Sequence, residues 1–288
     1  MSNARKTSIK SYLAKAIILL TVMAVLCFAA ACGVTANQPA SSDNTDKPTK
    51  DMSLSRVLGN GQLVVGLDVN YPPIGFMDEN GQIVGFDIDV AREACFRMGI
   101  DLVPKPIDWT EKDELLSSGA IDCIWNGMSV SPERVESMTL SEPYMKNQLI
   151  FMVSSDSEVR TFLDLRDKRI GVQTGTTAED EMEASEKFAE ATIISLPNIP
   201  AMFESLNNGE VDAILIDSVV AYYYVSHSEY DCYALPESYV EEKLAIGFRK
   251  GDFALRDRIQ QILYDMNDDG TLAKISEKWF GGDITIVR

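Results

Sequence analysis

Histidine and cysteine are scarce in this chain of 288 residues. Its one histidine, His227, leaves almost nothing for a Ser-His nucleophile or a zinc site. The spacing of Cys95, Cys123 and Cys232 fits no metal motif. We expect these three to be free thiols, with one disulfide as the alternative. The sequence therefore predicts no metal, no cofactor and no catalytic residue.

Basic residues are also few. Lys and Arg number 26 against 44 Asp and Glu, which gives a formal net charge of −18 at pH 7. Such a surface repels a phosphate backbone, so we expect no nucleic-acid partner. With 45% hydrophobic and 24% charged residues, the chain is nonetheless globular and long enough for two modest domains.

Long apolar runs are confined to the front of the chain. Residues 1–31 contain basic residues and no acid, and an apolar or small-residue run covers 16–31. Because this run is shorter than the roughly 20 residues that span a bilayer, we expect an export signal over 1–31. It resembles a lipoprotein signal with Cys32 as the lipidated first residue, although Ala29 stands where that class usually has Leu. A plain secretory signal is the alternative.

The segment 32–52 is rich in Ser, Thr, Asn, Asp, Pro and Lys and has no hydrophobic periodicity. We expect a flexible linker that reaches on the order of 25 Å. No later run is apolar enough to span a membrane. We therefore expect an extracytoplasmic body held at the outer face of the cell membrane through a lipid on Cys32, or a periplasmic or secreted protein if Cys32 carries no lipid.

The stretch I-D-C-I-W-N-G-M-S-V-S-P-E-R occupies residues 121–134. Its apolar start predicts a strand over 121–125 that breaks at Asn126-Gly127. The S-P-E-R end predicts a helix that begins at Ser131, with proline in its first turn. The free N–H groups of that helix would face the carboxyl end of the strand.

Two side chains of this corner suit an anion. Arg134 has a planar fork that matches a carboxylate, and Ser129 adds a hydroxyl. The stretch therefore predicts a carboxylate-binding pocket without a nucleophile. An ordinary capped helix with a surface arginine is the alternative.

The same pattern returns later in the chain. The segment L-L-S-S-G-A-I-D-C-I-W-N at 115–126 resembles S-L-N-N-G-E-V-D-A-I-L-I-D at 205–217, which predicts two related α/β lobes. Asn126-Gly127 and Asp217 would then occupy corresponding strand ends. The aligned residues are Gly119 with Gly209 and Asp122 with Asp212.

Ligand-type side chains follow three other expected strands, over 62–67, 102–107 and 169–173. In open α/β sheets, ligands bind beyond the carboxyl ends of the strands. The residues that this places at strand ends are Asp68, Tyr71, Trp109, Gly175 and Thr176.

The third of these loops reads T-G-T-T at 174–177. Thr176 supplies an N–H and a hydroxyl, and the spacing is not that of a nucleotide P-loop. Thr177 and Asp180 form a capping pattern for a helix that reaches about residue 189. A capped helix without a ligand is the alternative. Elsewhere we expect helices over 89–98, 253–266 and 271–279, helices around 115–116 and 222–224, and a strand over 244–248.

Taken in order, these stretches resemble the extracytoplasmic solute-binding proteins of amino-acid ABC importers, of the polar amino-acid type known as family 3. The resemblance runs from about residue 62 to 281. It is carried by the motifs G-L-D-V-N-Y-P-P, V-G-F-D-I-D-V-A, S-G-A-I-D-C-I-W-N-G-M-S-V-S-P-E-R, S-E-P-Y, G-V-Q-T-G-T-T, G-E-V-D-A-I-L-I-D and D-G-T-L-A-K-I-S-E-K-W-F-G.

The resemblance implies a two-lobed α/β fold, in which each lobe is an open sheet flanked by helices and two hinge strands join the lobes. Lobe one would comprise 53–144 and 245–288, and lobe two 145–244. The hinges would lie near 144–148 and 240–244. Such proteins bind an L-amino acid as monomers by closing the lobes and deliver it to the permease subunits of an ABC importer.

The resemblance also implies roles for the shared part of the ligand. Arg134 would bind the α-carboxylate with help from Ser129 and Thr176. Asp217 would accept the α-ammonium together with the carbonyl of Gly127.

The ligand's side chain would meet the other half of the implied site. Tyr71 and Trp109 would enclose it, whereas Asp68, Gln173 and Asn126 would line the distal part and tune specificity. These residues favour amide and other polar neutral amino acids.

Other readings of the sequence remain open. Some dehydratases resemble this fold and would use Asp68 or Asp217 for proton transfer. A non-transport, ligand-sensing lipoprotein and a structural lipoprotein are further alternatives. Turnover of the bound ligand would indicate the enzyme, and failure to bind any amino acid would indicate the structural lipoprotein.

Overall fold

The computed structural model describes residues 50–288. The expected export signal, Cys32 and all but the last three residues of the expected linker lie outside the described residues. Across 50–288, no helix combines the length and the apolar character needed to cross a bilayer. In the same range Cys95 and Cys123 are buried, Cys232 is half-buried, and none of the three is in a disulfide.

Nine strands of the described part form one mixed sheet. The main path runs β10-β9-β11-β8-β12-β6-β1-β5, and β7 pairs with β12. The bounds are β1 Gln62–Leu67, β5 Asp101–Pro106, β6 Cys123–Ser129, β7 Thr139–Leu140, β8 Met145–Ser154, β9 Arg169–Gln173, β10 Thr192–Leu196, β11 Ala213–Asp217 and β12 Cys232–Phe248. A small second sheet contains β2 Asn70–Tyr71, β3 Gly75–Met77 and β4 Ile83–Val84.

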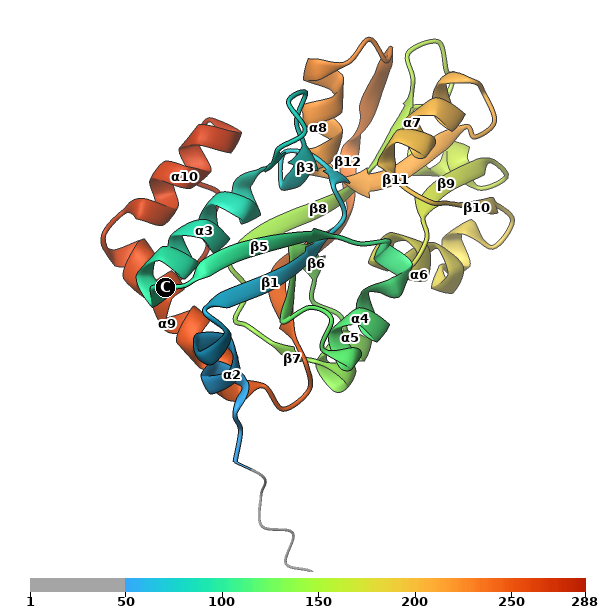
Figure 1. Ribbon diagram of the computed structural model, residues 1–288. Helices are drawn as coiled ribbons and strands as arrows, with labels where there is room; N and C mark the ends of the chain where they lie inside the picture. The colour runs from blue at the N-terminus through green and yellow to red at the C-terminus, as the bar shows by residue number, and fades with distance from the viewer. Residues whose placement is uncertain (1–49) are drawn as a thin grey trace, which may run out of the picture. The chain divides into compact units, whose positions relative to one another are not determined.

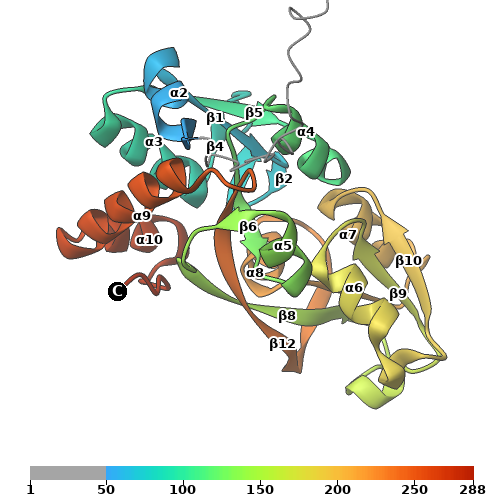
Figure 2. The same cartoon turned by 90° about the horizontal axis from the view of Figure 1, so that it is seen from below.

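The main sheet has two similar halves around a central pair. In the first half β1 pairs in parallel with β5 and β6, and in the second half β9 pairs in parallel with β10 and β11. The long strands β8 and β12 are antiparallel to each other and pass between the halves (Figures 1 and 2). This arrangement agrees with the two-lobed α/β fold expected from the sequence.

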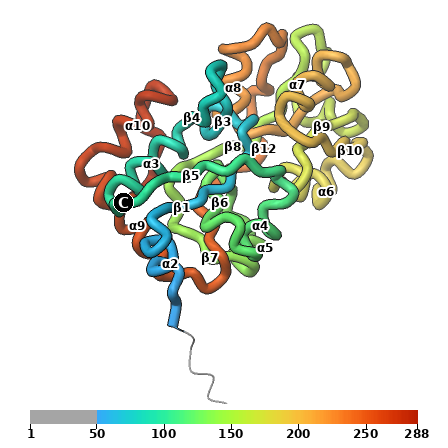
Figure 3. Tube along the Cα trace, in the orientation of Figure 1, coloured from blue at the N-terminus to red at the C-terminus, as the bar shows by residue number. Residues whose placement is uncertain are grey.

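Helices cover the two halves separately. In the first half these are α2 Ser53–Asn60, α3 Phe86–Met98, α4 Lys112–Ser118, α5 Pro132–Ser137, α9 Phe253–Asp268 and α10 Thr271–Phe280. In the second half they are α6 Thr177–Ala184, α7 Ile199–Asn207 and α8 Ser218–His227. Short 3-10 turns occupy Trp109–Glu111, Phe162–Leu165 and Glu186–Phe188. The chain trace returns from β12 to the first half, where α9 and α10 pack beside α2 and α3 (Figure 3).

Two helix boundaries differ by more than two residues from the expected ones. Helix α3 begins at Phe86 rather than at 89, because Gly85, at φ 138°, makes the turn and its carbonyl accepts the first helical hydrogen bond from Asp89. Helix α6 ends at Ala184 rather than near 189, and a 3-10 turn over Glu186–Phe188 completes the segment.

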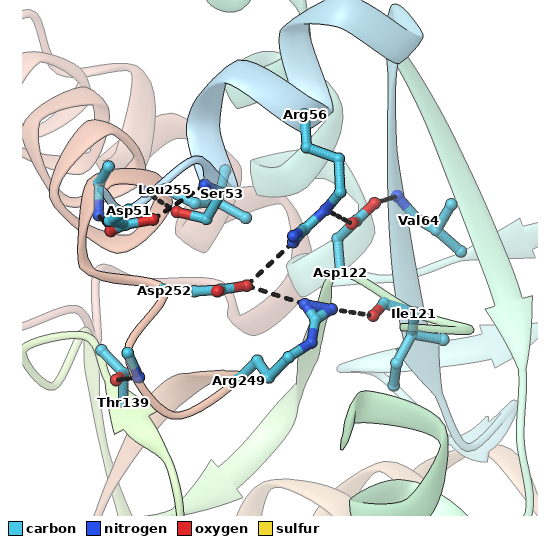
Figure 4. A network of polar contacts seen from close by, with 12 residues as sticks. Asp51, Ser53, Arg56, Val64, Ile121, Asp122, Thr139, Arg249, Asp252 and Leu255 are labelled. Atoms are coloured by element: carbon cyan, nitrogen blue, oxygen red, sulfur yellow. Dashed lines mark hydrogen bonds and ion pairs between the residues drawn. The ribbon is translucent and has the colours of Figure 1, made fainter. Parts of the chain in front are cut away.

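The start of the described chain is tied to the first half by a polar network (Figure 4). Arg56 and Arg249 both contact the Asp252 carboxylate, at 3.0 and 2.8 Å. Asp51, which falls in the expected linker, accepts hydrogen bonds from the N–H groups of Ser53 and Ala254. The last residues of the expected linker are therefore bound to the folded body.

Candidate functional site

The ten residues predicted as ligand-binding all line a single pocket. The ten are Asp68, Tyr71, Trp109, Asn126, Gly127, Ser129, Arg134, Gln173, Thr176 and Asp217. Leu149, Thr177 and Ala178 also line it, and the sequence did not identify them as site residues.

Strand β6 supplies one wall of the pocket through a bulge. The expected break at Asn126-Gly127 is wrong, because β6 continues to Ser129. Its pairing register with β12 shifts within this stretch, so the chain bulges out and then re-enters the sheet. Gly127 has φ 59°, and an added Cβ would lie 3.0 Å from the ring of Tyr71. A glycine is required here for both reasons.

Arg134 reaches the pocket from the first turn of α5, as the sequence predicted. The Ser131 hydroxyl caps α5 by accepting the N–H of Arg134 at 3.3 Å, with Pro132 in the first turn. The Arg134 side chain is only 7% exposed, and its Nη1 donates to the Ser129 carbonyl at 2.7 Å.

No acidic side chain among residues 50–288 forms an ion pair with Arg134. Burial lowers the pKa of this guanidinium, and the charge of Glu242 opposes that shift. A buried arginine without a carboxylate partner carries a desolvation cost that an anionic ligand group would offset. The arrangement thus fits the predicted carboxylate site.

Helix α6 presents its N-terminus to the same pocket from the second half of the fold. The expected capping by Thr177 and Asp180 is wrong: Thr176 is the cap residue, and no side chain from the described part of the chain accepts a hydrogen bond there. The Thr176 hydroxyl donates to the Gln173 carbonyl at 2.7 Å, and Thr177 donates to Glu242 at 2.5 Å. The first N–H groups of α6 are therefore not capped by a side chain, which suits an anion.

Asp217 ends β11 and lines the same pocket as Arg134. Its carboxylate accepts hydrogen bonds from the Asn147 amide and from the hydroxyl of Tyr71. Desolvation, and then the negative charge of Glu242, raise the pKa of Asp217 to about 7. A cationic group bound beside Asp217 would restore its charged form.

The side chains expected at the distal end already join the two halves. Gln173 donates to the Asp68 carboxylate at 3.0 Å, and both residues are buried. The indole N–H of Trp109 donates to the Gly175 carbonyl at 3.0 Å. Asn126 accepts the N–H of Asp68 at 2.8 Å and so fixes the strand end that carries it. The contacts between the two halves hold the cleft closed in this structure.

Two residues that the sequence did not identify, Glu242 and Asn147, form hydrogen bonds to side chains that line the pocket. They face each other in the register of β12 and β8, and the Asn147 amide donates to Glu242 at 2.9 Å. The one available sequence signal was the polar alternation of these two strands. Within 50–288, no cluster of three His, Cys, Asp or Glu side chains could hold a metal ion.

Comparison with known proteins places this fold and pocket in a family. The profile of the bacterial extracellular solute-binding proteins, family 3, matches residues 63–282, and the chain belongs to this family. The L-cystine-binding protein TcyJ of Escherichia coli strain K12 is 30% identical over 234 residues, which cover 81% of this chain and 87% of TcyJ. The expected family resemblance is therefore confirmed.

Two solved structures support the same placement. The crystal structure of Tv2483 bound to L-arginine has a TM-score of 0.79 and 31% identity, over 82% of this chain and 98% of that one. The ancestral amino acid-binding protein AncCDT-1, a precursor of cyclohexadienyl dehydratase, has a TM-score of 0.74 and 33% identity, over 79% of this chain and 99% of that one. The two-lobed fold is confirmed by these neighbours.

Proposed function

We propose that this protein binds an L-amino acid between its two lobes and delivers it to the permease subunits of an ABC importer. The observation that carries the proposal is a split charge complement: Arg134 from one half and Asp217 from the other face one pocket. An α-amino acid has a carboxylate and an ammonium a fixed distance apart. A site with one cation and one anion in facing walls suits such a zwitterion.

Closure follows from the way in which the site is divided. With lobes at 53–144 plus 245–288 and at 145–244, Arg134 and Ser129 belong to lobe one and Thr176 and Asp217 to lobe two. The hinges lie where β8 and β12 pass between the halves. A ligand completes its contacts only when the lobes meet, so its differential affinity stabilises the closed state.

The roles within the pocket follow the predicted pattern. Arg134, Ser129 and the N–H groups at the start of α6 bind the α-carboxylate. Asp217 and the Gly127 carbonyl bind the α-ammonium. These groups are common to all amino acids, so the ligand's identity is set elsewhere.

The distal wall sets the choice of ligand. Tyr71 and Trp109 enclose the ligand's side chain, with Asn126 at the wall. The Asp68 carboxylate and the Gln173 amide, 3.0 Å apart, suit a side chain that both donates and accepts hydrogen bonds. TcyJ is named for L-cystine and Tv2483 is seen with L-arginine. These two ligands share the α-amino and α-carboxylate groups but differ in their side chains. A polar amino acid, with an amide as first choice, fits this wall.

The protein's location is proposed to be the outer face of the cell membrane. An export signal over 1–31, a lipid on Cys32 and a linker over 32–52 would hold a monomeric binding body at the outer face of the cell membrane. The family is extracellular, which supports export. Palmitate labelling that is lost in Cys32→Ser, with continued secretion, tests the anchor.

One observation favours an enzyme as the second candidate function. Asp217, with its pKa near 7, has the property of a general acid in a cleft, and AncCDT-1 is a dehydratase precursor. Incubation with the bound ligand and mass spectrometry separates the two. Unchanged ligand supports binding, whereas loss of water or carbon dioxide from it would establish the enzyme.

A thermal-shift screen of the twenty L-amino acids tests the proposed function. A ligand at 100 times its dissociation constant adds about 2.7 kcal/mol to folding stability, which moves the melting temperature by several degrees. The matched control is the α-amide of each stabilising amino acid, which lacks the carboxylate. Stabilisation by one or a few amino acids but not by their amides is expected. No stabilisation by any amino acid would refute the proposal.

A further inference from the structure

Glu242 lies behind the pocket at the junction of the two halves. Its Oε2 accepts the Ser129 hydroxyl at 2.9 Å, and its Oε1 accepts the Thr177 hydroxyl at 2.5 Å. Ser129 ends β6 in the first half, whereas Thr177 begins α6 in the second half. One carboxylate therefore orients a pocket hydroxyl from each side of the cleft.

Strand register places Glu242 close to Asp217. Glu242 stands opposite Asn147 on the adjacent strand β8, and Leu149, two residues along, stands opposite Asp217. Asn147 is thus a diagonal neighbour of Asp217 on the same face. Its single amide nitrogen donates to both carboxylates.

Two carboxylates that share one amide cannot both carry a full charge at low cost, because like charges at this separation repel in a partly desolvated site. The other titratable groups that face the pair are Tyr71 from β2 and Arg134 from α5. The Tyr71 hydroxyl donates to Asp217, and Arg134 forms no ion pair with Asp217 or Glu242. No cation in ion-pair contact therefore offsets the negative charge that the second carboxylate would carry.

We propose that Glu242 is a further positioning residue of the site: it holds the Ser129 and Thr177 hydroxyls and, together with burial of the site, keeps Asp217 protonated until the ligand's ammonium displaces that proton. This inference rests on the proposed function. The proton leaves the Asp217 carboxyl group for solvent, and the ammonium keeps all three of its protons. Ligand binding is then coupled to the release of one proton below neutral pH.

The coupling fixes the pH dependence of affinity. A carboxyl group with a pKa of about 7 is roughly nine-tenths protonated at pH 6 and one-tenth at pH 8. Affinity should therefore rise about tenfold from pH 6 to pH 8.

Titration calorimetry with L-glutamine and L-arginine provides the test. Wild-type protein in phosphate and in imidazole at pH 6, two buffers with different ionisation enthalpies, should release close to one proton per ligand. Glu242→Gln should release clearly less than one proton, and its affinity should change by less than the wild type's tenfold between pH 6 and pH 8, because burial alone then raises the pKa of Asp217. The matched control is Glu241→Gln, because Glu241 is exposed and points to the opposite face of β12. It should behave as the wild type does.

Two outcomes would overturn the inference. One is a wild-type affinity that does not change from pH 6 to pH 8, without proton release. The other is a Glu242→Gln variant with the same pH dependence and the same proton release as the wild type. The protonation of Asp217 can also be measured in ligand-free protein, by carbon-13 NMR of the aspartate carboxyl carbons. The Asp217→Asn variant assigns the signal. The Asp217 signal should titrate near pH 7 in the wild type and lower in Glu242→Gln. A wild-type midpoint below pH 5 refutes the inference. Failure of wild type to bind any amino acid refutes the proposed function instead.

Discussion

Asp122 and Asp212 make the same pair of backbone hydrogen bonds in the two halves of the fold. The Asp122 carboxylate accepts the Val64 N–H at 3.0 Å, and the Asp122 N–H donates to the Val64 carbonyl at 2.8 Å. Asp212 does the same with Arg169, at 2.8 Å in both directions. Each aspartate thus fixes the start of the neighbouring parallel strand, and the echo seen in the sequence corresponds to a repeated structural unit.

Removal of either carboxylate should destabilise the fold by a similar amount. Asp122→Ala and Asp212→Ala each leave a strand N–H without its acceptor, which costs about 1–3 kcal/mol. Urea unfolding measures the effect, and Asp167→Ala, at an exposed aspartate, is the control. A loss confined to one of the two variants would contradict the equivalence.

Asp87 should make folding stability depend on pH in the neutral range. It is fully buried, accepts the Gly127 N–H at 2.7 Å and the Tyr144 hydroxyl at 2.8 Å, and burial raises its pKa to about 7. The unfolded chain ionises this group near pH 4, so between pH 4 and 7 the folded state binds the extra proton. Stability should therefore fall as pH rises through this window and level off above 7.

The isosteric variant Asp87→Asn isolates this contribution. Its free energy of unfolding should fall less steeply than that of wild type from pH 5 to pH 7, by up to about 1.4 kcal/mol per pH unit. Asp217, with its own raised pKa, remains in both proteins and cancels in the difference. Identical slopes for the two proteins would show that Asp87 is ionised throughout.

An aromatic contact outside the pocket should help to hold the cleft closed. The Phe76 ring, on β3, lies 5.6 Å from the Tyr223 ring, on α8, and 5.9 Å from that of Trp279. Such pairs contribute about 0.5–1.5 kcal/mol. Because the Phe76 and Tyr223 pair joins the two halves, Phe76→Ala should weaken the binding affinity for every ligand by roughly 2- to 10-fold.

The effect of Phe76 is best separated by a double-mutant cycle of Phe76→Ala and Tyr223→Ala, read out as ligand affinity. Phe96→Ala, at a phenylalanine that is 77% exposed on α3, is the control and should leave affinity unchanged. Additive single effects would mean that the contact does not stabilise closure.

Asp68 should influence which ligand binds, not whether one binds. Asp68→Asn removes a buried negative charge from the distal wall while its partner Gln173 keeps an oxygen to bond. Affinity for cationic amino acids should fall at least tenfold relative to neutral ones. Competition calorimetry with L-arginine and L-glutamine measures the ratio, and an equal loss for both would assign Asp68 a purely structural role.

The sequence predicted the pocket well because its residues stand at strand ends. Parallel strands carry their carboxyl ends to one edge, so local patterns such as D-V-N-Y-P-P and T-G-T-T indicate their position without any knowledge of long-range contacts. The roles of those residues in binding remain predictions.

What the sequence did not reveal depends on register between distant strands. Glu242 and Asn147 meet across β12 and β8, 95 residues apart, and the polar alternation of the two strands does not single out either one. The bulge at Gly127 likewise reflects how β6 pairs with β12, so N-G appeared to end the strand. At Thr177, a tertiary bond to Glu242 replaced the expected local cap.

Titration calorimetry of wild type and Arg134→Ala with the amino acid found in the screen tests the central claim most directly. The claim is that this buried guanidinium, which has no ion-pair partner among residues 50–288, binds the ligand's carboxylate. Loss of a buried partner for a charged group costs roughly 2–5 kcal/mol, so binding should weaken at least thirtyfold or disappear. An Arg134→Ala variant that folds and binds within threefold of wild type would contradict the account.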